Sequence, residues 1–183
     1  MNIEATAIAD LMLVETSAHA DARGAFSRLF CQQELSALIG PRRIVQINHS
    51  RTAAVGSVRG LHYQNPPAAE MKMVRCLKGR VWDVAVDLRR DSATFLRWHA
   101  AELSQDNMRM MVIPEGCAHG FQVLEANSEL LYLHTAAYTP EAEGGVRYDD
   151  PVLGVPWPLA VTDISRRDAG LAPIEPAFEG LSP

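Results

Sequence analysis

Short apolar segments, β-branched or alternating with polar residues, recur along most of the chain, and glycine and proline residues separate them. Such segments occupy residues 44–48, 71–77, 81–88, 95–103, 108–113, 121–124 and 129–137. A period of two is typical of a strand with one buried face. Many short strands at regular spacing predict an all-β sandwich or barrel. We therefore expect an all-β fold with only short helices at its periphery.

Three local patterns refine this expectation. Residues Gln32–Ile39 carry apolar side chains at a helical spacing and precede a Gly-Pro pair, which predicts a short helix. The Lys78-Gly79 pair between two apolar segments is typical of a β-hairpin turn. Prolines are frequent after residue 150. We expect residues 1–183 to form one domain, in which residues 151–183 are a wrapping tail with a short helix near Asp163–Asp168.

The composition excludes several classes of protein. Of the 183 residues, 48% are hydrophobic and 21% charged, which is enough for one core and shows no sign of disorder. The net charge of -5 argues against a nucleic-acid partner, because binding to phosphate chains relies on lysine and arginine. The three widely spaced cysteines indicate reduced thiols. The sequence shows no signal-peptide pattern and no apolar run long enough for a membrane span, so we expect a cytoplasmic protein with no membrane partner.

The stretch Gly56–Gln64, with the sequence G-S-V-R-G-L-H-Y-Q, contains the first candidate site. In a regular strand, His62 and Gln64 share one face, and Arg59 and Leu61 lie on the other. Two prolines follow and end the strand. A lone histidine is more often a core residue with a satisfied hydrogen bond. The polar neighbours here favour a functional site instead.

A second motif, P-E-G-C-A-H-G, spans Pro114–Gly120. Its proline and glycine predict a tight turn between two strands that directs His119 inward. Together the two motifs resemble the signature of the cupin superfamily, whose fold is a jelly roll, or double-stranded β-helix. Gln64 stands where that signature usually has a second metal-binding histidine, and Glu70 and Gly79 follow at looser spacing.

One alternative is therefore a metal-dependent cupin, an oxygenase or an isomerase. Its ligands would be His62, Gln64, Glu70 and His119. Glutamine is a poor replacement for a histidine ligand, so we expect no metal and no cofactor.

Several longer motifs resemble the dTDP-4-dehydrorhamnose 3,5-epimerase family. The similarity extends from about Asp21 to Asp168. Its motifs are Q-I-N-H-S (46–50), R-G-L-H-Y-Q-N-P-P (59–67), K-M-V-R-C (72–76), G-R-V-W-D-V-A-V-D-L-R (79–89), I-P-E-G-C-A-H-G-F (113–121) and D-P-V-L-G-V-P-W-P (150–158).

The resemblance implies epimerisation of a dTDP-linked 4-keto-6-deoxy sugar through an enolate, in the synthesis of dTDP-L-rhamnose or a related deoxysugar. By resemblance, His62 is the base and Asp168 orients it. Lys72 stabilises the enolate oxygen, Tyr132 returns the proton from the far face, and His119 lies near the same oxygen or the sugar. Reaction at only C3 or only C5 remains open, as does a non-catalytic sugar-nucleotide binder.

The same resemblance implies a nucleotide subsite and a dimer. Arg23 and Arg59 are expected to hold diphosphate oxygens, because guanidinium groups bind them in a bidentate manner. The other implied ligand contacts are Gln46, Asn48, Tyr138, Glu143 and Arg167. We also expect a homodimer in which residues 1–20 form an exchanged strand.

The chain departs from the family pattern at several positions. Arg28 stands where the family usually has glutamate, and Tyr148 replaces a common tryptophan. Leu133 and His134 follow Tyr132, where the family often has lysine and threonine. Two acidic residues, Asp83 and Asp87, alternate with apolar residues, and we expect them to support the fold or to pair with arginines.

Overall fold

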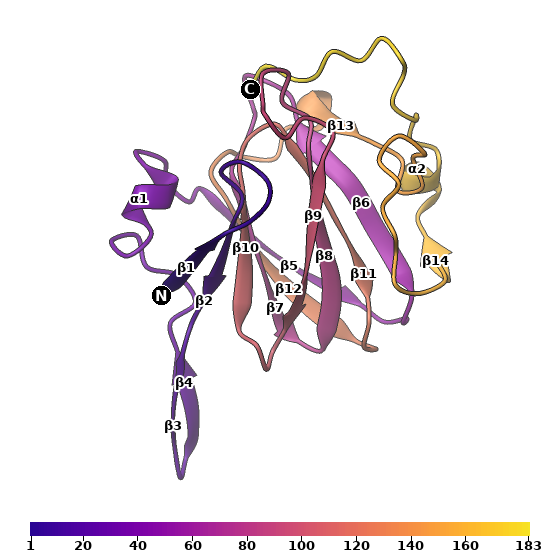
Figure 1. Ribbon diagram of the computed structural model, residues 1–183. Coiled ribbons are helices and arrows are strands. Elements are labelled where there is room, and N and C mark those ends of the chain that lie inside the picture. Colours follow the sequence, from indigo (N-terminus) through magenta and orange to yellow (C-terminus); the bar gives the residue numbers. More distant parts are fainter.

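The computed structural model describes all 183 residues, which form two packed β-sheets (Figure 1). The first sheet has the strand order β1-β2-β10-β7-β12-β5. Its strands are β1 (Asn2–Ala5), β2 (Met12–Glu15), β10 (Arg109–Ile113), β7 (Lys72–Lys78), β12 (Ser128–His134) and β5 (Gln46–Thr52).

The second sheet has the order β13-β6-β11-β8-β9, and a further short strand, β14, pairs with β6. Its strands are β13 (Glu143–Gly145), β6 (Ser57–Gln64), β11 (Cys117–Val123), β8 (Arg80–Asp87), β9 (Trp98–Ser104) and β14 (Asp163–Ile164). From β5 to β8 and from β9 to β13, consecutive strands lie in alternate sheets, which is a jelly-roll arrangement. The prediction of an all-β jelly roll is confirmed.

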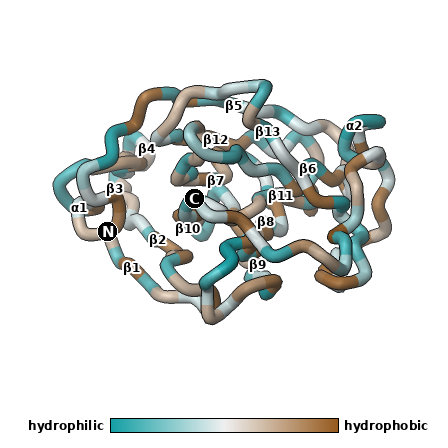
Figure 2. The backbone as a smooth tube through the Cα atoms, turned by 90° about the horizontal axis from the view of Figure 1, so that it is seen from above, coloured by the Kyte–Doolittle hydropathy of each residue, from teal (hydrophilic) through white to brown (hydrophobic).

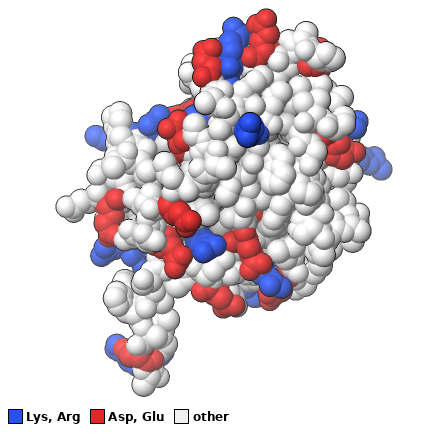
Figure 3. Space-filling view, in the orientation of Figure 1, with Lys and Arg blue, Asp and Glu red and all other residues white.

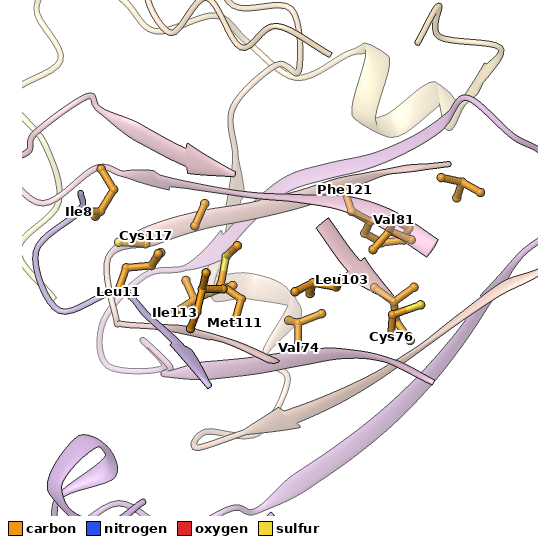
Figure 4. Packing of buried hydrophobic residues seen from close by; sticks show 14 residues of the cluster. Ile8, Leu11, Val74, Cys76, Val81, Leu103, Met111, Ile113, Cys117 and Phe121 are labelled. Atoms are coloured by element: carbon orange, nitrogen blue, oxygen red, sulfur yellow. The ribbon is translucent and has the colours of Figure 1, made fainter. Parts of the chain in front are cut away.

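The main core lies between the sheets (Figure 4). Val74 and Met111 reach it from the first sheet, and Val81 and Phe121 from the second. All four are nearly inaccessible to solvent. Each core-facing position alternates with one on the outer face. The alternation in the sequence therefore arises, as expected, from strands with one face buried in the core.

Segments outside the two sheets cover their outer faces. Helix α1 (Ser36–Ile39) buries Ile39 beside Met73 and Met110 of the first sheet. The tail packs Phe178 and Leu181 against the outer cluster of the second sheet. Figure 2 shows α1 and the second short helix, α2 (Arg166–Ala169), at opposite ends of the molecule. One 3-10 turn, η1 (Pro140–Ala142), precedes β13.

Three predictions about local structure need correction. The Lys78-Gly79 turn is not a hairpin, because β7 pairs with β10 and β12 whereas β8 pairs with β9 and β11. The turn therefore carries the chain from one sheet to the other. The predicted helix at Gln32–Ile39 is shorter, since no side chain caps its N-terminus. The helix expected near Asp163–Asp168 begins only at Arg166, after β14.

A separate hairpin projects from the body of the molecule (Figure 1). It consists of β3 (Ala18–Asp21) and β4 (Gly24–Ser27), joined by a tight turn at Ala22 and Arg23. Nearly all its residues are exposed, including Phe26 at 73%. Strands β1 and β2, within the segment expected to be exchanged, pair inside their own sheet. The three cysteines are free, as expected.

No helix in the structure is both long enough and apolar enough to cross a membrane.

Candidate active site

A cleft of about 470 Å³ opens between the two sheets. Eight of the twelve residues predicted from the sequence line it. They are Asn48, Arg59, His62, Lys72, His119, Tyr132, Arg167 and Asp168. Strands of both sheets supply them, and the segment from β14 to α2 closes one side. The jelly roll therefore brings residues from six elements to one place.

Strand β6 is irregular at the cleft, so Arg59 and His62 both line it. The register between β6 and β11 shifts after the pair His62–His119. At this point Gly60 has φ +114°, and a Cβ there would lie 2.6 Å from the Cα of Gly120. Only glycine permits such a close approach of the two backbones. The prediction that Arg59 faces away from His62 is wrong for this reason.

His62 forms a pair with Asp168. Its Nε2 lies 2.9 Å from Asp168 Oδ1, and the other carboxylate oxygen accepts the Gly60 N–H at 3.2 Å. Ser165 caps α2 by accepting the Asp168 backbone N–H, which fixes where the carboxylate projects. Burial opposes ionisation of Asp168, but these hydrogen bonds keep its pKa below the ordinary value. Nε2–H therefore donates to a carboxylate, and Nδ1 of His62 is left to accept a proton.

Tyr132 and Lys72 come from the first sheet, on the other side of the cleft. The Tyr132 hydroxyl lies 3.0 Å from Ser50 Oγ, and burial raises the pKa of the phenol, so the proton stays on its oxygen at neutral pH. Lys72 Nζ lies 3.1 Å from the carboxylate of Glu70, and its side chain is only 13% exposed. The cleft thus places a proton acceptor on one sheet, and a proton donor and a cation on the other.

His119 lies beside Tyr132, with ring centroids 6.3 Å apart in an edge-on arrangement. Its Nε2 is 2.8 Å from Asp83, which is fully buried. Burial raises the pKa of Asp83, although His119 acts in the opposite direction. The expectation that Asp83 supports the fold or pairs with an arginine missed this contact, whereas Asp87 does pair with Arg89 at 2.9 Å.

The sequence contained a sign that Asp83 has a buried partner. Asp83 is in phase with Val81 and Ala85, which belong to the core. A carboxylate on the core face of a strand requires a buried partner.

A connected rim borders the cleft. It is formed by four predicted ligand residues, namely Gln46, Tyr138, Glu143 and Arg167, of which Arg167 also lines the cleft. Gln46 Oε1 accepts the Tyr138 backbone N–H at 3.0 Å. The Tyr138 hydroxyl donates to Glu143 at 2.7 Å, and Arg167 pairs with the same carboxylate at 2.6 Å. The rim thus presents amide, phenol and guanidinium groups, which suit a polar ligand.

Arg23 is the one predicted residue that the single chain does not bring near the cleft. It lies at the tip of the projecting hairpin, where its side chain is 89% exposed and pairs only with Asp21. Arg28 also lies elsewhere, paired with Glu34.

The donors of the metal alternative do not converge. His62 and His119 each bond to an aspartate, and Glu70 bonds to Lys72 and His134. The Gln64 amide donates to two backbone carbonyls. No group of three His, Cys, Asp or Glu side chains in the chain is arranged as a metal site.

Comparison with known proteins places this geometry in a family. The family model for dTDP-4-dehydrorhamnose 3,5-epimerase matches residues 5–175. The chain belongs to the dTDP-4-dehydrorhamnose 3,5-epimerase family. It is 40% identical to the dTDP-4-dehydrorhamnose 3,5-epimerase of Salmonella typhimurium over 175 residues, which cover 94% of this chain and 95% of the relative.

Two solved structures of this epimerase family are similar throughout. The Bacillus anthracis enzyme, crystallised with TDP and PPi, has a TM-score of 0.91 at 35% identity and covers 94% of this chain and 99% of its own. The Legionella pneumophila enzyme, in complex with dTDP-4-keto-L-rhamnose, has a TM-score of 0.88 at 42% identity and covers 93% and 90%. The cupin-type jelly roll and the assignment to the isomerases are thereby confirmed.

One cleft residue was noted in the sequence only as a departure from the epimerase family. His134 lines the cleft and is 8% exposed. It ends β12, two residues after Tyr132, and therefore projects from the same face of the strand. Alternation along the strand was the signal that could have placed it in the site.

Proposed function

We propose that the chain epimerises a dTDP-linked 4-keto-6-deoxy hexose at C3 and C5, as an epimerase of dTDP-L-rhamnose or related deoxysugar synthesis. The observation that carries this proposal is the placement of the His62–Asp168 pair and Tyr132 on different sheets around one cleft. Epimerisation needs an acceptor on one face of the sugar carbon and a donor on the other.

The proton transfers balance without a redox step. His62 Nδ1 accepts the proton from the carbon next to the ketone, and the electron pair moves onto the keto oxygen. The Lys72 ammonium stabilises this enolate, and the imidazolium is stabilised by Asp168. The Tyr132 hydroxyl then gives its proton to the same carbon from the opposite face. Reprotonation of the phenolate and release of the proton from His62 to solvent complete the cycle.

The nucleotide end of the substrate fits the polar part of the cleft. Arg59 lies there, with its Nε donating to Thr52 Oγ1 at 3.0 Å, which leaves its terminal nitrogens for phosphate oxygens. The rim of Gln46, Tyr138, Glu143 and Arg167 then lies near the sugar or the base.

Product analysis tests the proposal. Purified protein is incubated with dTDP-4-keto-6-deoxy-glucose, and the ring-proton couplings of the product are measured by NMR. Inversion at C3 and C5 is the expected result. Inversion at one carbon names a single-site epimerase, and an unchanged sugar at high enzyme concentration contradicts the proposal.

The position of Arg23 is explained by a homodimer in which the hairpin of one chain reaches the cleft of the other. Arg23 would then contact the diphosphate in the partner's cleft. The hairpin leaves the body, its tip carries the charged pair Asp21–Arg23, and the rest of its surface is uncharged (Figure 3). Large apolar side chains are also exposed on the hairpin (Phe26), on β5 (Ile47) and immediately before β5 (Val45). Such groups are expected to be covered by another protein surface.

Mixed dimers test this arrangement. Arg23→Ala and His62→Ala are each expected to lose activity. If Arg23 acts on the partner's cleft, co-expression of the two variants yields dimers with one intact site and regains activity. Dimers with no regained activity, or a monomer by light scattering, contradict the arrangement.

A further inference from the structure

A row of polar side chains crosses the first sheet from the rim into the cleft. Gln46 on β5 is the register partner of His134 on β12, and His134 is the register partner of Lys72 on β7. Neighbouring side chains on one face of paired strands lie roughly 5 Å apart. The row therefore connects the rim of the cleft to the cation that faces the substrate.

Hydrogen-bond directions along this row are fixed from its outer end. The Tyr138 backbone N–H can only donate, so Gln46 Oε1 accepts from it. Gln46 Nε2 then donates to Asn48 Oδ1 at 3.2 Å, which leaves the Asn48 amino group facing His134 Nε2 at 3.4 Å. Nε2 of His134 must accept in this arrangement, so its hydrogen lies on Nδ1.

Nδ1 of His134 lies 2.7 Å from Glu70 Oε2, and Lys72 Nζ lies 3.1 Å from Glu70 Oε1. The two donors thus occupy separate oxygens of one carboxylate that is only 8% exposed. Burial opposes ionisation of Glu70, but the hydrogen bond of His134 and the charge of Lys72 bring its pKa below the ordinary value. Glu70 is therefore an ionised carboxylate with both oxygens held, one by His134 and the other by Lys72.

His134 also packs on Tyr132, with ring centroids 6.1 Å apart and planes inclined by 20°. Two roles are therefore open to its side chain in the cleft. It can act by its hydrogen bond to Glu70, or only by its packing against the tyrosine.

We propose that His134 is a positioning residue for the epimerase reaction. It acts through Glu70, and it sets where the Lys72 ammonium lies and how much of the ammonium charge the Glu70 carboxylate offsets. This inference rests on the proposed function, because Lys72 is assigned there to the enolate oxygen. His134 itself exchanges no proton with the sugar.

The physical reason lies in how the negative charge of Glu70 is shared. An ammonium has three N–H groups, of which Glu70 takes one. When His134 donates to Oε2, the carboxylate is fixed in orientation and part of its charge is neutralised. Without that bond, the carboxylate can turn and bind Lys72 with both oxygens, which withdraws the ammonium from the keto oxygen. The loss falls on the transition state, where the oxygen becomes negative.

Two variants separate the two roles. His134→Asn keeps a donor near the position of Nδ1 but loses most of the stacked ring. His134→Phe keeps the ring on Tyr132 but has no donor. We expect His134→Phe to lower kcat about 10-fold with little change in KM, less than the roughly 10²-fold effect of removing an oxyanion donor itself. We expect His134→Asn to stay within about threefold of the unaltered protein in kcat.

His49 provides the matched control, because it is an exposed histidine on β5 that pairs with Glu129 at 3.1 Å outside the cleft. His49→Phe and His49→Asn are expected to leave kcat and KM unchanged. Thermal melting of each variant checks that it folds.

A second readout needs no turnover. In protein labelled with 15N-histidine, the shifts of His134 are expected to show hydrogen on Nδ1 and a lone pair on Nε2. Glu70→Gln is expected to change this pattern, because a glutamine amide can donate to Nδ1 instead of accepting from it. This readout stands even if the natural substrate is another sugar, so failure of the proposed function and failure of this inference are distinguishable.

The inference is overturned if His134→Phe retains kcat while His134→Asn loses it, since His134 then acts by packing. Equal loss in both variants with both proteins folded also contradicts it. A spectrum with hydrogen on Nε2 in the unaltered protein would remove the hydrogen-bond row on which the inference depends.

Discussion

His62 and Asp168 are separated by 106 residues, yet the imidazole Nε2 and the carboxylate Oδ1 lie 2.9 Å apart. The contact joins a strand of the second sheet to a helix of only four residues in the tail. Burial of the aspartate, at 5% exposure, strengthens this contact, because water competes little for its carboxylate. The base of the proposed reaction is thus completed only when the tail has folded onto the jelly roll.

Replacing the orienting carboxylate tests this relationship. We expect Asp168→Asn to lower kcat by roughly 10² to 10⁴, because the amide can no longer stabilise the imidazolium. Turnover is measured by NMR of the product sugar. Asp149→Asn is the control, since Asp149 is an exposed residue that pairs with Arg147. Full activity of Asp168→Asn would show that His62 needs no charged partner.

Removal of the proposed acid separates proton abstraction from inversion. Tyr132→Phe leaves His62 able to take a proton and return one to the same face. In deuterated water we therefore expect deuterium to enter the sugar without inversion of the carbon. NMR distinguishes the labelled starting sugar from the labelled product. Normal inversion by Tyr132→Phe would exclude the tyrosine as the donor, and Tyr148→Phe is the control.

The turn after β8 makes a prediction about stability. Asp87 is fully buried and accepts hydrogen bonds from Arg89, Ser92 and Thr94. We expect Asp87→Ala to lower the free energy of unfolding by about 3 kcal/mol, because it leaves the largely buried Arg89 with only the exposed Asp10 as an acidic partner. Urea unfolding measures the change. Asp21→Ala on the exposed hairpin should leave the free energy of unfolding almost unchanged, and equal effects of both substitutions would refute the assigned role of burial.

Acid should destabilise the fold for a related reason. The folded-state pKa values of Asp87 and Asp168 lie below the ordinary value of 3.8. These carboxylates therefore stabilise the folded state at pH above that value, and the contribution is lost as pH falls through the lower folded-state values. We expect the free energy of unfolding to fall below about pH 4. A value that stays constant between pH 5 and pH 2 would contradict this expectation.

The sequence predicted the strands well, because period-two alternation reports directly which face is buried. It did not predict their partners. The Lys78-Gly79 turn has hairpin chemistry, yet it joins strands in different sheets, since local residues do not encode which sheet the next strand enters. The family motifs placed eight of twelve expected residues in the cleft.

For most of the site residues that the sequence misplaced, the orientation or the partner of the side chain is set by contacts between distant parts of the chain. Arg59 faces the cleft only because Gly60 and Gly120 let the strand register shift. Asp83 acquired its partner from another strand, and no local pattern identifies His119 as that partner. Arg23 lies in the turn between β3 and β4, on the hairpin that projects from the body (Figure 1), so no local pattern indicates which cleft it would reach.

In the proposed reaction, His62 removes a proton beside the ketone of a dTDP-linked sugar. The most direct measurement is deuterium entry into dTDP-4-keto-6-deoxy-glucose in deuterated water, followed by NMR at C3 and C5, with His62→Ala in parallel. We expect deuterium at both carbons with the unaltered protein and at neither with the variant. Equal exchange in both proteins, or none in either at high enzyme concentration, would contradict the claim.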